Sequence, residues 1–298
     1  MTYQVKKFDL YCSIILLKAL AHLLNSTNSP VKPKLRIVLF LTIAFVWSWV
    51  SWFIGLHFIS SGVNDKTIKP FITFLFIGIY GPMLSAIATT WRFDGLAGVA
   101  RLLKKLTIWK APLIIYLVIL FLPLIIPAIS IGLYRLFYGS VGRFDVHAVA
   151  LIPIYLWAAL RLGPLGEELG WRGFLLPELQ RSFSPVKSSL IIGIVWTCWH
   201  IPLFFGPIGT AVSGAPVTIV SVLFFYIFVT CLACIYTWLV NRSHGSVLTA
   251  LLIHLFINAG LVMLFFPDLA AHSKQLYYFS APVFIAFTLY LGLKTRFK

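Results

Sequence analysis

Two adjacent carboxylates, Glu167 and Glu168, are followed by Arg172 in a chain that is apolar almost everywhere. On a helix, Glu168 and Arg172 lie four residues apart with the acid first. This is the favourable order for an ion pair, so we expect Arg172 to neutralise Glu168. Glu167 points about 100° away from Glu168 around the helix and has no partner of its own. A carboxylate without a partner in a poorly hydrated site is a candidate general base or general acid.

A histidine lies deep in the next apolar stretch, IVWTCWHIPLFF. Pro202 removes a backbone donor two residues after His200, and we expect it to kink or end the helix there and to open a small polar cavity. Trp196 lies one turn before His200 on the same helix face and should pack over it. Taken alone, His200 fits a structural histidine as well as a catalytic one.

A third polar pair, His254 and Asn258, lies in the apolar stretch SVLTALLIHLFINAG. The two residues are four apart and therefore share one helix face. Such a pair could hold a metal ion, or it could position a water and donate hydrogen bonds to a developing oxyanion. The alternative is an interhelical hydrogen-bonding pair that only stabilises a helix bundle.

These polar groups lie on three apolar segments that contain almost no other ionisable side chain. Ionisable groups at membrane depth are costly, and they mark functional sites by default. We therefore predict one shared site, supported by the neighbouring ion pair of Glu168 and Arg172 and by the ring of Trp196. Its members are Glu167, His200, His254 and Asn258.

The composition identifies the elements that must hold this site. The 298 residues are 60% hydrophobic and 11% charged, and their mean hydropathy is +0.95, which exceeds what a soluble core of this size could bury. The chain is therefore predicted to be an all-α, polytopic membrane bundle. A helix needs about 20 apolar residues to cross the hydrocarbon core, which gives about eight spans. We place them at 36–60, 68–91, 112–134, 146–162, 188–206, 216–240, 247–266 and 277–293.

The formal net charge of +16 arises from Lys and Arg that flank these spans. Basic residues in short connections favour the cytoplasmic side, so both termini are predicted to be cytoplasmic in a multi-pass protein of the cell membrane. Nucleic acid is not an expected partner, because no soluble basic module with interleaved aromatic residues is present. The lipid bilayer is the expected partner.

Residues 1–35 are predicted to be a cytoplasmic N-terminal segment. Its stretch FDLYCSIILLKALAHLL imitates a signal peptide, but Lys18 interrupts the apolar run. An interfacial helix is therefore favoured over a cleaved signal. Residues 36–298 then form a single membrane-embedded domain, with the polar motifs inside a core of about 146–266.

At these motifs the sequence resembles a known family, the CPBP intramembrane proteases, named for CAAX-protease and bacteriocin-processing enzymes. Three family motifs appear in order over roughly residues 163–260. They are E-E-x-x-x-R from Glu167 to Arg172, F-x-x-x-H ending at His200, and H-x-x-x-N from His254 to Asn258. Trp196 stands where the second motif usually has phenylalanine, which keeps an aromatic wall beside the histidine.

The resemblance implies an α-helical intramembrane endopeptidase whose cavity opens to the cytoplasmic side and whose substrate is a membrane-associated protein or peptide. Glu167, assisted by His200, would activate the hydrolytic water. His254 and Asn258 would stabilise the oxyanion, and the adjacent ion pair would hold the geometry of the site. In a metalloprotease version the same four side chains would bind zinc. The sequence does not choose between the two mechanisms.

Two other classes of function share these features. A CPBP-like membrane protein without peptidase activity would act as a bacteriocin self-immunity factor or as a scaffold, and the intact set of four polar residues favours catalysis over this role. A proton-coupled transporter could use the same acid and histidines as a relay. No broken spans recur in corresponding halves of the sequence, which argues against a transporter.

Overall fold

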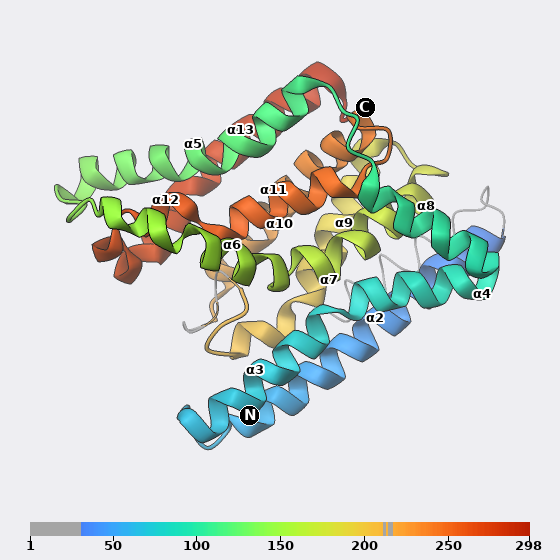
Figure 1. Cartoon of the computed structure of the whole chain (residues 1–298), viewed down its shortest axis with the longest axis horizontal. Coiled ribbons are helices and arrows are strands. Elements are labelled where there is room, and N and C mark those ends of the chain that lie inside the picture. Colours follow the sequence, from blue (N-terminus) through green and yellow to red (C-terminus); the bar gives the residue numbers. More distant parts are fainter. Residues whose placement is uncertain (1–30, 211–212, 214–216) are drawn as a thin grey trace.

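The computed structural model describes residues 31–210, 213 and 217–298. Residues 1–30, which hold most of the predicted N-terminal segment 1–35 and its interfacial helix, lie outside this range. The described chain is an all-α bundle, as predicted (Figure 1).

Long helices alternate with short helical turns along the chain. The long helices are α2 (Val31–Phe58), α3 (Asp65–Ile79), α4 (Gly81–Lys104), α5 (Leu113–Tyr138), α6 (Ile152–Arg161), α9 (Pro185–Trp199), α10 (Ile219–Arg242), α11 (Val247–Ala259) and α13 (Ser273–Thr295). The short ones are η1 (Lys105–Thr107), η2 (Val146–Leu151), α7 (Pro164–Glu168), the π-helix η3 (Leu169–Leu175), α8 (Leu176–Gln180), η4 (Ile201–Phe205), α12 (Leu261–Leu264) and η5 (Pro267–His272).

Seven helical stretches of the described chain are long and apolar enough to cross a membrane. They begin at Lys34, Asp65, Leu113, Val146, Ile219, Val247 and Gln275. The fifth predicted span, 188–206, corresponds to the shorter apolar helix α9, because the helix ends at Trp199 and gives way to the 3₁₀ turn η4 that contains Pro202. The prediction that Pro202 ends the helix is confirmed.

The fourth span differs from its prediction. It was expected to end near residue 162, before the glutamates, but the helical stretch runs from Val146 to Gln180 and includes them. Gly163 has a positive φ of 138° and turns the chain between α6 and α7 without ending the stretch. Positive φ is accessible to glycine because it lacks a Cβ atom.

Small residues let α2 approach the junction of α3 and α4 closely, and the three helices run together along one side of the bundle (Figure 1). A Cβ atom on Gly81 would lie 2.1 Å from the hydroxyl of Ser48, so only glycine fits there. The Ser48 hydroxyl donates to the Gly78 carbonyl at 2.7 Å, and the Trp52 indole donates to the Leu75 carbonyl at 3.1 Å. Close packing of small residues and interhelical hydrogen bonds are what hold helices together in lipid.

Several segments that carry basic residues meet at one end of the bundle. Arg36 binds Asp94 through both terminal nitrogens, at 2.8 and 2.7 Å, and its Nε lies 3.0 Å from Glu178. Lys105 Nζ donates to the Gly173 carbonyl at 2.6 Å. These contacts join the beginning of α2 to α4, η1, η3 and α8, so segments predicted to share one side of the membrane do lie together.

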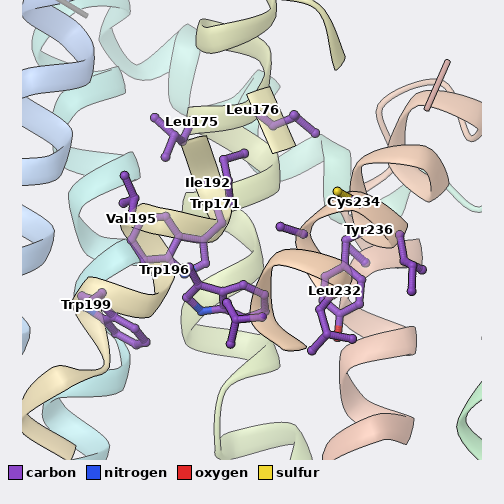
Figure 2. Packing of buried hydrophobic residues seen from close by; sticks show 14 of the residues in the cluster. Trp171, Leu175, Leu176, Ile192, Val195, Trp196, Trp199, Leu232, Cys234 and Tyr236 are labelled. Atoms are coloured by element: carbon purple, nitrogen blue, oxygen red, sulfur yellow. The ribbon is translucent and has the colours of Figure 1, made fainter. Parts of the chain in front are cut away.

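The centre of the bundle is formed by α11, which contacts α5, α6, α7 and α10. Helix α9 packs on α10, with Gly193 against Thr230. Figure 2 shows the rings of Trp171, Trp196 and Trp199 gathered between η3 and α9, with Tyr236 of α10 facing Trp196. The three polar motifs are thereby brought to one region, in which Glu167, Glu168, Arg172 and His254 are buried and Asn258 is exposed.

Candidate active site

The predicted ion pair of Glu168 and Arg172 is present and fully buried. Nη1 of Arg172 lies 3.0 Å from each carboxylate oxygen of Glu168, and both side chains are closed to solvent. The pair crosses from α7 into the π-helix η3, where the backbone N–H of Leu176 donates to the Trp171 carbonyl five residues back. Single π-turns inside α-helices are frequent at functional sites.

The guanidinium of Arg172 lies against the faces of two aromatic rings from other helices. Its Cζ atom lies 4.2 Å from the ring centre of Trp196 on α9 and 4.5 Å from that of Tyr236 on α10. The electron-rich faces of both rings attract the cation, and this attraction is strongest where water is excluded. The cation is therefore held in place by its acid and by two ring faces.

Glu168 has a second partner that the sequence analysis did not foresee. Nδ1 of His254 lies 2.7 Å from Oε1 of Glu168, and both side chains are buried. A carboxylate accepts hydrogen bonds, so Nδ1 of His254 carries the proton of this bond. The Nε2 atom is therefore the edge of the His254 ring that is turned away from Glu168.

Glu167 is also buried, but the prediction that it has no partner was wrong. Its Oε2 atom accepts a hydrogen bond of 2.5 Å from the Trp196 indole and a longer one of 3.3 Å from the Trp171 indole. Both partners are neutral, so Glu167 lacks a cation of its own although it does not lack donors. The two indoles leave Oε1 as the oxygen that is not engaged by a tryptophan.

Glu167, His254 and Asn258 converge beside Gly163. A Cβ atom built on Gly163 would lie 2.9 Å from Oε1 of Glu167, 3.1 Å from Nε2 of His254 and 3.1 Å from Nδ2 of Asn258. The three polar atoms therefore lie close to one another beside the backbone of Gly163. Asn258 also donates to the Leu162 carbonyl at 3.0 Å, which ties α11 to the turn that contains Gly163.

His200 caps the end of α9, at the edge of this arrangement. Its Nδ1 atom lies 2.8 Å from the Trp196 carbonyl and must be the donor, because a carbonyl only accepts. Its ring packs against Trp199 and Phe225, with ring centres 4.7 and 5.3 Å away, and Trp196 lies over it as predicted, at 6.0 Å. Within the described residues, no hydrogen bond joins His200 to Glu167, so the structure places the two in one region without direct contact.

The side chains of this site differ from those of a typical zinc site. Zinc sites in proteins use three or four side-chain ligands directed at one point. Among the residues that the structure describes, no group of three or more His, Cys, Asp or Glu side chains is placed to hold a metal ion. Within the described residues, the arrangement therefore lacks the usual zinc ligand set. Zinc binding by Glu167, His200, His254 and Asn258 stays an expectation from the residue types.

Three residues of the site were missed by the sequence analysis: Gly163, Trp171 and Tyr236. Trp171 had a usable signal, since it lies four residues after Glu167 and hence on the same helix face. Gly163 precedes the motif, where its positive φ could not be known. Tyr236 lies in an apolar stretch with no neighbouring charged residue to mark it.

Comparison with known proteins shows which family this part of the sequence resembles. Residues 148–260 match the family described as type II CAAX prenyl endopeptidase Rce1-like. The predicted resemblance to the CPBP family is confirmed. The CPBP-like segment contains all three motifs, and it falls inside the expected core of about 146–266.

A curated relative supports the same conclusion. CAAX prenyl protease 2 of Methanococcus maripaludis is 31% identical to this chain over 143 residues, which cover 45% of this chain and 52% of that protein. The chain therefore matches about half the length of this relative.

Proposed function

We propose that this protein is an intramembrane endopeptidase that hydrolyses a peptide bond of a membrane-associated protein or peptide. The observation that carries the proposal is the convergence of Glu167 Oε1, His254 Nε2 and Asn258 Nδ2 beside Gly163. Hydrolysis inside a membrane requires a water held by both donors and acceptors, and these atoms supply both kinds. The CPBP-like character of residues 148–260 supports the same reaction class.

In the proposed mechanism, Glu167 is the general base. The indoles of Trp196 and Trp171 occupy Oε2 and so direct Oε1 toward the water. When Oε1 takes a proton from the water, the resulting hydroxide attacks the carbonyl carbon of the scissile bond. Protonated Glu167 can then return that proton to the leaving amine. His200 has a free Nε2 lone pair, because Nδ1 carries its proton, and it assists by accepting from the same water.

Two groups on α11 act on the developing oxyanion. The amide of Asn258 donates from Nδ2, and preorganised donors of this kind contribute about 10²–10³-fold to acyl-transfer rates. In its imidazolium form, His254 also donates from Nε2, with the second proton on the Nδ1 bond to Glu168. Glu168 and Arg172 do not touch the reacting atoms in this scheme. They position His254.

We also propose that the protein lies in the cell membrane with both termini in the cytoplasm. The meeting of the basic connections at one end of the bundle supports this orientation, because cytoplasmic loops carry an excess of Lys and Arg. The site would then be entered from that side, and the substrate would reach it from the bilayer or from the cytoplasm. Nucleic acid has no part in the proposal.

The test compares purified wild type with Glu167→Gln, each reconstituted in lipid vesicles with a library of fluorogenic and membrane-anchored peptides. The proposal expects cleavage by wild type alone. Glu178→Gln is the matched control, since Glu178 is a buried carboxylate that binds Arg36 outside the site, and this variant should cleave. If Glu167→Gln cleaved as fast as wild type, or complemented a null strain equally well, the catalytic proposal would fail and a scaffold or immunity role would replace it.

A further inference from the structure

A hollow lined by both polar and apolar side chains lies away from the candidate active site. It has a volume of ≈ 420 Å³ and opens where the link after η1 meets the turn between α10 and α11. Its lining consists of Trp109, Lys110, Ala111, Pro112, Tyr116 and His244. None of these residues takes part in the proposed hydrolysis.

The hollow is held in shape by hydrogen bonds across sequence-distant segments. The Ser246 hydroxyl at the beginning of α11 donates to the Ile108 carbonyl at 2.5 Å, and the Tyr116 hydroxyl donates to the Trp109 carbonyl. The link, the first turn of α5 and the α10–α11 turn are therefore fixed to one another.

The backbone at His244 is unusual for a residue with a side chain. His244 has φ 56°, in the left-handed region that glycine enters most easily, and Gly245 N–H then donates to the Val240 carbonyl at 2.9 Å to close helix α10. Helices commonly end in this way with glycine at the left-handed position. Here an imidazole is kept at that position despite the conformational cost, and it lines the hollow.

The surroundings are basic and contain no acidic residue. Residues 105–112, 241–246 and 294–298 hold Lys and Arg but neither Asp nor Glu. The last of these segments is brought close by a 2.8 Å hydrogen bond from the Asn241 amide to the Phe297 carbonyl. Lys110 and His244 are exposed, and within the described chain neither forms an ion pair. The positive charge here is therefore available to an external anion.

The hollow also lies at the ends of candidate membrane spans, where we expect lipid headgroups. It is bordered by the ends of apolar spans, at the beginning of α5, the end of α10 and the beginning of α11. Trp109 is largely exposed at this level, and Tyr116 is half-buried. Tryptophan and tyrosine concentrate at membrane–water interfaces, and basic pockets between spans on the cytoplasmic side bind anionic headgroups.

We propose that this hollow binds the phosphate of an anionic membrane lipid. Lys110 Nζ and the His244 ring would donate to the phosphate oxygens, and Trp109 and Tyr116 would pack against the glycerol region of the lipid. Because Ser246 ties the hollow to the first turn of α11, the lipid would brace the helix that carries His254 about two turns further on, about 12 Å away. This inference does not depend on peptidase activity.

The experiment uses the full-length protein in a neutral detergent, titrated with phosphatidylglycerol or phosphatidylcholine, with bound lipids counted by native mass spectrometry. Wild type should retain phosphatidylglycerol in preference to phosphatidylcholine. Lys110→Gln should weaken that binding about fivefold, as expected for one basic residue near the surface, and Lys110→Gln/His244→Gln should weaken it further. Lys187→Gln/His147→Gln, at exposed positions outside the hollow, is the matched control and should bind as wild type does.

Three readings decide the outcome. Equal binding of phosphatidylglycerol by wild type and by the Lys110/His244 double variant would overturn the proposal. Full displacement of the lipid by millimolar inorganic phosphate would also overturn it, in favour of a site for a free anion. An unchanged melting temperature of the double variant in lipid-free detergent would show that any lost binding does not reflect unfolding, and a lowered one would be resolved with Lys110→Gln alone.

Discussion

His254 and Glu168 are joined by a 2.7 Å hydrogen bond although 86 positions separate them in the sequence. Through this bond the buried pair of Glu168 and Arg172 orients the imidazole that faces the reaction centre. A histidine held at Nδ1 by a carboxylate has a fixed ring orientation, which is how second-layer carboxylates commonly act on catalytic and metal-binding histidines. The geometry to test is therefore the series of contacts from Arg172 through Glu168 to His254.

Removing the Arg172 cation alone should destabilise the protein more than removing the charges of Arg172 and Glu168 together. Arg172→Ala leaves Glu168 as a buried, uncompensated charge, and breaking a buried pair in this way costs about 3–5 kcal/mol. We expect a markedly lower melting temperature and lower expression for Arg172→Ala. The double variant Glu168→Gln/Arg172→Met should recover much of that stability but not activity. Thermal unfolding in detergent checks the first expectation, and peptide cleavage checks the second.

Trp196 should contribute to activity through its indole N–H as well as through its ring. Trp196→Phe keeps a ring face over Arg172 but removes the 2.5 Å donor to Glu167, so Glu167 retains only the weaker Trp171 contact. We expect a lower kcat with a smaller change in KM, because the loss affects the base and not substrate binding. A hydrogen bond to a charged group is worth about 1.5–3 kcal/mol, which bounds the loss at roughly 10–150-fold. Trp199→Phe, a neighbouring indole without a bond to Glu167, should leave kcat near the wild-type value.

Tyr236 should act through its ring face and not through its hydroxyl. The Tyr236 hydroxyl is buried without a hydrogen-bond partner in the described chain, whereas its ring lies against the Arg172 guanidinium. Tyr236→Phe should therefore be neutral or slightly stabilising. Tyr236→Leu should destabilise the protein, by up to about 2 kcal/mol from the lost cation–π contact in addition to the packing defect. Melting temperatures of the two variants decide the point, and equal losses in both would contradict this role.

Gly163 should tolerate no side chain because a Cβ atom would occupy the reaction centre. In Gly163→Ala the methyl group would lie about 3 Å from polar atoms of Glu167, His254 and Asn258, where the attacked carbonyl and the water must fit. We expect peptide cleavage to fall below detection. Positive φ adds strain of about 1–3 kcal/mol in stability.

Gly139→Ala is the control that separates backbone strain from obstruction of the reaction centre by the new methyl group. Gly139 also has a positive φ, of 83°, but a Cβ atom built there meets nothing within 4 Å. This control should lose stability to a similar extent and keep its specific activity. Comparable loss of activity per folded molecule in both variants would contradict the assignment of the reaction centre.

Much of the site follows from local sequence. Apolar runs of span length set the all-α membrane fold, and Pro202 ends α9 because proline cannot continue the backbone hydrogen bonding. The Glu168–Arg172 pair forms because residues four apart on a helix are neighbours whatever surrounds them. His254 and Asn258 share a face of α11 for the same reason. These relationships are short in sequence, so helical geometry alone decides them.

Only the tertiary structure decided which groups meet across helices. The 2.5 Å donor to Glu167 comes from α9, the carboxylate partner of His254 comes from α7, and the rings over Arg172 come from α9 and α10. Such contacts depend on how helices cross and on where Gly163 turns the chain, and no spacing within one segment encodes them. The sequence pattern therefore identified the candidate reactive residues, whereas the packing of α7, η3, α9, α10 and α11 determined their partners on other helices. The physical reason is that helical geometry determines which residues of the same helix are neighbours, whereas only packing against other helices determines which residues of different helices are in contact.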